Sequence, residues 1–62
     1  MNDDFDVRQK RFRREWTLQR IEINQNALLT DLPYYQRIAA ETTIRFLQAE
    51  IARLDAWLKE HE

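Results

Sequence analysis

Apolar residues recur at every third or fourth position through the second half of the chain. This spacing keeps them on one side of an α-helix and is typical of the contact seam of a coiled coil or helical bundle. The seam has intervals of 4, 3, 4, 3 and 4 and consists of Ala40, Ile44, Leu47, Ile51, Leu54 and Leu58. Phe46 and Trp57 lie on one flank and widen the apolar stripe. We therefore expect a helix over about residues 34–60 whose seam packs in a bundle core.

The first half of the chain is expected to form another helix, over about residues 4–29, with apolar groups on two nearly opposite sides. Leu18, Ile21 and Leu28 share one side and are expected to complete the hairpin core with the seam residues. The residues that we expect at an interface between chains share the other side: Phe5, Phe12, Trp16 and Ile23. Burying one such side chain is worth about 1.5–3 kcal/mol, so a small domain gains from covering this second side.

Another interpretation of the first half is a bend or break of the helix between Phe12 and Leu18. The N-terminal piece would then turn a different face onto the same core or form a short separate helix. The polar cluster Asn24, Gln25 and Asn26 interrupts the apolar pattern beyond that point. A straight helix and a kinked helix both offer more apolar surface than one hairpin covers.

Pro33 is the only proline, and the chain contains no glycine. A single proline near the middle predicts one break between helices, because proline lacks the backbone N–H and clashes with the preceding turn. We place the turn at about residues 30–33. Asp31 is the expected N-cap of the second helix, with Leu32 and Pro33 in its first turn.

With 62 residues, the chain is expected to form one domain whose own core is marginal. Small scaffolds usually add disulfides, a metal or a partner subunit, but this chain has no cysteine and a single histidine, His61. Self-association is therefore the expected source of additional stability. In a parallel coiled-coil dimer, the acids Glu50 and Asp55 would face each other. An antiparallel partner with basic flanks suits these acids better, and the first helix of the same hairpin is such a partner. We accordingly expect an all-α, antiparallel two-helix hairpin that forms a dimeric four-helix bundle.

Cations are concentrated in one stretch, although the formal net charge is only −1. Residues 8–14 contain no acid and five cations: Arg8, Lys10, Arg11, Arg13 and Arg14. Such a run could contact the phosphates of a nucleic acid or an acidic protein partner. Alternatively, the cations form a solvated face that pairs with Asp4, Asp6 or the acidic second helix of a neighbour. A domain that binds nucleic acid is usually basic overall, which favours the pairing interpretation.

The sequence offers no recognisable catalytic site. A two-helix chain has little concavity, and this one lacks a cysteine nucleophile, a glycine-rich phosphate loop and paired histidines. We therefore expect no enzyme, no cofactor and no metal site. No apolar run approaches the length of a membrane span, and we expect a cytoplasmic protein. The expected function is a homo-oligomeric protein-interaction or regulatory module, and the alternative is a nucleic-acid-binding regulator that uses residues 8–14.

In architecture, the expected dimer resembles the small antiparallel helical-hairpin dimers, which include a plasmid copy-number regulator that binds paired RNA loops. The resemblance is one of fold alone, without a shared motif, and fold does not imply function. Free-standing hairpins of this size are common among accessory proteins of phages and plasmids, so the resemblance implies a phage- or plasmid-type accessory role.

Overall fold

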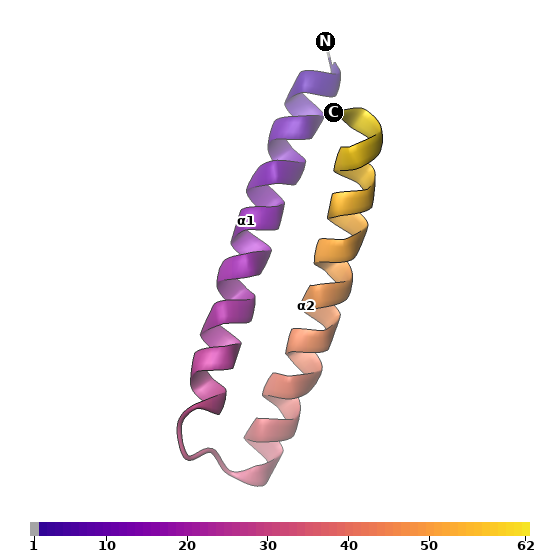
Figure 1. Cartoon of the computed structure of the whole chain (residues 1–62). Helices are drawn as coiled ribbons and strands as arrows, with labels where there is room; N and C mark the ends of the chain where they lie inside the picture. Colours follow the sequence, from indigo (N-terminus) through magenta and orange to yellow (C-terminus); the bar gives the residue numbers. More distant parts are fainter. Residues whose placement is uncertain (1) are drawn as a thin grey trace.

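The computed structural model describes the backbone of residues 2–62 and the side chains of residues 4–62. Its two helices, α1 (Asn2–Leu28) and α2 (Tyr34–His61), pack side by side and are joined by a short loop. They run in opposite directions, so the start of α1 and the end of α2 lie at the same end of the molecule (Figure 1). The Cα trace measures 48 × 14 × 12 Å along its principal axes. The structure confirms the predicted all-α helical hairpin.

The first helix is continuous. α1 runs unbroken through Phe12 and Leu18, so the alternative of a break between these residues is wrong. No described residue has a positive φ, and α1 therefore ends without the left-handed residue that glycine usually supplies. Instead, the last turn tightens, because Thr30 donates both its amide, at 3.1 Å, and its hydroxyl, at 2.6 Å, to the carbonyl oxygen of Ala27.

The prediction that Asp31 caps the second helix is wrong, because α2 begins only after Pro33. Pro33 occupies the cap position with φ −57° and ψ 153°, and no side chain caps the helix. The ring of a proline disfavours the helical conformation of the residue before it, so Leu32 is excluded from a first helical turn. The carbonyl of Pro33 accepts a hydrogen bond from the amide of Arg37 at 3.0 Å, which starts the helical pattern.

The hydrophobic core is a narrow seam along the line where the two helices meet. At its centre, Ile21 of α1 packs with Ile44 and Leu47 of α2. The buried apolar residues are Ile21, Ala40, Ile44, Leu47, Leu54 and Leu58. The half-buried residues of the expected core are Leu18, Leu28 and Ile51. No large side chain of the described residues is fully enclosed, so the core of a single hairpin is thin.

α1 presents a largely polar row to α2. The row has intervals of 4, 3, 4, 3 and 4, is buried or half-buried throughout, and consists of Lys10, Arg14, Thr17, Ile21, Asn24 and Leu28. Thr17 is 4% exposed, and its hydroxyl donates to the carbonyl oxygen of Arg13 at 2.8 Å. Sequence reasoning missed Thr17 as a core residue, although its position four residues before Ile21 is the signal that identifies it.

Candidate interaction surface

Four large apolar side chains of α1 remain exposed along one side of the helix. Phe5, Phe12, Trp16 and Ile23 follow one another at intervals of 7, 4 and 7 residues, and we call this strip the outer face. Their exposed fractions are 54%, 75%, 55% and 66%, respectively. Contiguous apolar surface of this kind marks an interaction site more often than it stays in contact with water. The outer face is therefore the candidate functional site.

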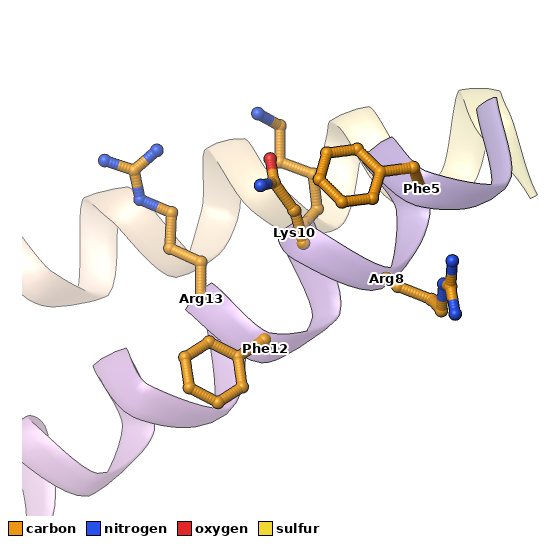
Figure 2. A pocket seen from close by; sticks show the side chains of 6 residues that line it. Phe5, Arg8, Lys10, Phe12 and Arg13 are labelled. Atoms are coloured by element: carbon orange, nitrogen blue, oxygen red, sulfur yellow. The ribbon is translucent and has the colours of Figure 1, made fainter. Parts of the chain in front are cut away.

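The N-terminal half of the outer face carries cations beside its aromatic rings. Figure 2 shows Phe5 and Phe12 with Arg8, Lys10 and Arg13, and these side chains line a shallow, open depression. One helix supplies all the lining residues, and the depression is open to solvent. It therefore lacks the enclosure that a small-molecule site or an active site requires.

A hollow between the two helices extends the apolar surface onto α2. Trp16 of α1 and Phe46 of α2 line this hollow, and Phe46 is 71% exposed. The guanidinium carbon Cζ of Arg20 lies 5.3 Å from the centroid of the Trp16 ring, which is a cation–π arrangement. Phe46 widens the apolar stripe of α2 beyond the part that α1 covers, because two packed helices bury only the seam and its immediate edges.

Two arginines of the basic stretch form ion pairs with acids in or directly after α2. Arg14 Nε donates to Asp55 Oδ1 at 2.5 Å, and Arg11 is bonded to Glu62. The hydrogen bond that Arg14 donates to Asp55, together with the negative charge of that carboxylate, raises the pKa of the Arg14 guanidinium above its ordinary value. All four side chains are substantially exposed, so solvent and salt screen these pairs.

Two further cations of the stretch also lie against α2. Arg13 Nε is 4.0 Å from Glu50 Oε1, and the other oxygen of that carboxylate accepts a hydrogen bond from Arg53 at 3.0 Å. Lys10 Nζ lies 5.2 Å from the centroid of the Trp57 ring, half-buried between the helices. The stretch is therefore divided: four of its five cations contact α2 or Glu62, the residue that follows it, in the same chain.

Arg8 is the remaining cation of residues 8–14. Its side chain is exposed, and it takes part in no ion pair among the side chains that the structure describes. The acids that pair with Arg11, Arg13 and Arg14 belong to the same chain. For the basic stretch itself, sequence reasoning named Asp4, Asp6 or the second helix of a neighbour as partners. The same reasoning also expected the basic flanks of the first helix to suit Glu50 and Asp55 of the same hairpin.

The ends of the hairpin carry aromatic residues. The exposed rings of Tyr34 and Tyr35 meet edge to face with centroids 6.2 Å apart. His61 is stacked on Trp57 at 3.9 Å between centroids, with its Nδ1 2.8 Å from the carbonyl oxygen of Trp57. Across residues 4–62, no three histidine, aspartate or glutamate side chains gather as metal ligands would.

Neither of the two described helices has an apolar stretch long enough to cross a bilayer. The chain matches no known protein family, no curated protein sequence and no solved structure.

Proposed function

We propose that this chain is a small, non-enzymatic interaction or regulatory module of the cytoplasm that acts as a homodimer. Two hairpins pack through their outer faces and form a four-helix bundle. The observation that carries the proposal is the exposure of Phe5, Phe12, Trp16 and Ile23 along one side of a hairpin whose own core is thin. A chain with so little enclosed apolar surface gains stability from a partner.

The area of the outer face suits a dimer interface. Large aromatic side chains bury about 150–250 Å² each, so four large side chains that are more than half exposed leave roughly 500 Å² of apolar surface in water. Each partner of a standard interface contributes about 800 Å². The four side chains account for more than half of that area, and the polar residues on both sides of the strip supply the remainder.

Sedimentation velocity and light scattering test the proposal. We expect a mass close to twice the chain mass of 7.7 kDa at micromolar concentration, and a thermal midpoint that rises with protein concentration. A monomer that unfolds cooperatively, with a midpoint independent of concentration, would contradict the proposal.

Binding of nucleic acid through residues 8–14 is the second candidate function. The observation in its favour is Arg8, which is exposed beside Phe5 and Phe12, where a base could stack and a phosphate could pair. The contacts of the other four cations with α2 or Glu62 and the net charge of −1 weigh against it. We expect no mobility shift of duplex or single-stranded probes at low salt; a shift that disappears steeply with salt would establish this alternative.

A further inference from the structure

We infer that the partner on the outer face is the same face of a second copy that runs antiparallel, with Phe12 of each chain packed against Trp16 of the other. This inference rests on the proposed self-association and adds the direction and register of the two α1 helices. Three features of α1 carry it: the order of apolar and polar residues along the strip, the charges on its two flanks, and the absence of five of those six charges from the ion pairs among the described side chains of the hairpin.

The order of apolar and polar positions along the outer face is the same in both directions. With the two glutamines between its apolar members, the strip has intervals of 4, 3, 4, 3 and 4 and consists of Phe5, Gln9, Phe12, Trp16, Gln19 and Ile23. Its polarity is apolar, polar, apolar, apolar, polar, apolar. In an antiparallel pair with Phe12 opposite Trp16, Phe5 lies opposite Ile23 and Gln9 opposite Gln19. Every layer then joins groups of like polarity, and the glutamine amides can bond to each other.

The first flank of the strip supplies opposite charges at matching positions. This flank consists of the residues directly before Gln9, Trp16 and Ile23, which are Arg8, Glu15 and Glu22. In an antiparallel pair this flank meets the same flank of the second copy, so Arg8 of each chain faces Glu22 of the other. The two-fold axis brings Glu15 next to its own copy, which places one like-charge contact beside two opposite-charge contacts.

The second flank repeats this arrangement. It consists of the residues directly after Phe5, Phe12 and Gln19, which are Asp6, Arg13 and Arg20. Asp6 of each chain faces Arg20 of the other, and Arg13 meets its own copy at the axis. The charge of Arg13 is already offset by Glu50 of its own chain, with Nε and Oε1 4.0 Å apart.

A parallel pair matches the charges less well. The two different flanks would then meet with an offset of five residues. Arg8 of each chain would face Arg13 of the other, and Glu15 would face Arg20. Two repulsive contacts would thus cancel two attractive ones, whereas the antiparallel pair has four attractive contacts against two repulsive ones.

The flanking charges are also available for a partner. The ion pairs of the hairpin, among the described side chains, join Arg13, Arg14 and Arg53 to acids of α2 and Arg11 to Glu62, which follows α2. The other five flanking charges, which take part in none of these pairs, are Asp6, Arg8, Glu15, Arg20 and Glu22. A second copy is a partner that neutralises four of them at once.

A charge exchange tests the direction. In an antiparallel dimer, Arg8→Glu alone places the introduced carboxylate opposite Glu22 at both symmetric contacts, and Glu22→Arg alone creates two contacts between arginines. We expect each change to raise the dissociation constant of the homodimer about tenfold. Mixing the two variants restores opposite charges at both of these contacts, so native mass spectrometry should show heterodimer well above the statistical half.

A parallel dimer makes a different prediction. Arg8→Glu would then face Arg13 and tighten the homodimer, Glu22→Arg would have little effect, and the mixture would be statistical. Arg45→Glu and Glu41→Arg, at exposed positions of α2, are the matched controls and should mix statistically. A dimeric wild type whose Arg8 and Glu22 variants mix statistically overturns the inferred direction, whereas a monomeric wild type overturns the self-association on which the inference rests.

Discussion

Replacing Phe12 by alanine separates the stability of the dimer from the stability of the hairpin. Phe12 is 75% exposed on the outer face of one chain, so the hairpin loses little when the ring is removed. Exposed substitutions of this kind usually change the free energy of unfolding by less than about 0.5 kcal/mol. We expect Phe12→Ala to keep the helical content and the fold of the hairpin.

The effect on association follows from the exposed fraction of the ring. Burying a whole phenylalanine side chain is worth about 1.5–3 kcal/mol, and three quarters of this ring is available for burial by a partner. The dimer therefore loses roughly 1–2 kcal/mol for each copy, or roughly 2–4 kcal/mol for the symmetric pair. A factor of ten in affinity corresponds to about 1.4 kcal/mol, so the dissociation constant should rise by about thirtyfold to several hundredfold.

Sedimentation over a range of concentrations measures this change, and circular dichroism shows whether the helices persist. Leu29→Ala is the matched control, because Leu29 is 85% exposed in the turn and lies outside the outer face. It should leave the dissociation constant unchanged. If wild type is a dimer and Phe12→Ala binds itself equally well, Phe12 lies outside the interface and the reasoning from its exposure is refuted.

Three further changes probe the hairpin and its contacts. Trp16→Ala should shift the assembly toward monomer more than Leu47→Ala does, whereas Leu47→Ala, at a buried position, should cost about 2–5 kcal/mol and lower the helical content by circular dichroism; the reverse order would contradict the assigned faces. Arg14→Ala and Asp55→Ala should each lower the thermal midpoint, with effects that are not additive and that shrink in molar salt, because the pair is exposed; additive, salt-independent effects would show that the two charges do not interact. Thr17→Val should keep or raise the thermal midpoint, since the hydroxyl serves only the carbonyl of its own helix; a clear drop would show that this bond supports the core.

Much of the fold follows from two features of the sequence. The apolar seam of the second half fixes which side of α2 is buried, as Ile44, Leu47 and Leu54 show. Pro33 alone places the break, because it lacks the amide that a continuous helix needs. The two opposed apolar groups of the first half also predict that α1 keeps one apolar side exposed in a single hairpin.

Other details depend on interactions that periodicity alone does not represent. Asp31 has the side chain of a good N-cap, but the restriction that Pro33 places on Leu32 moves the start of the helix. Thr17 is buried because its position in α1 faces α2, although its hydroxyl is polar; it satisfies that hydroxyl within its own helix. The partners of the basic stretch depend on the register of the two helices, which brings Asp55 to Arg14.

The most direct test of the central claim is an isotope-filtered nuclear Overhauser experiment on an equal mixture of labelled and unlabelled chains. Only contacts between different chains give signals in such a spectrum. The account predicts signals between the ring protons of Phe12 and the indole of Trp16, which lie on the exposed outer face of each hairpin. A dimer whose signals between chains come only from other surfaces, or a chain that gives none because it is monomeric, would contradict it.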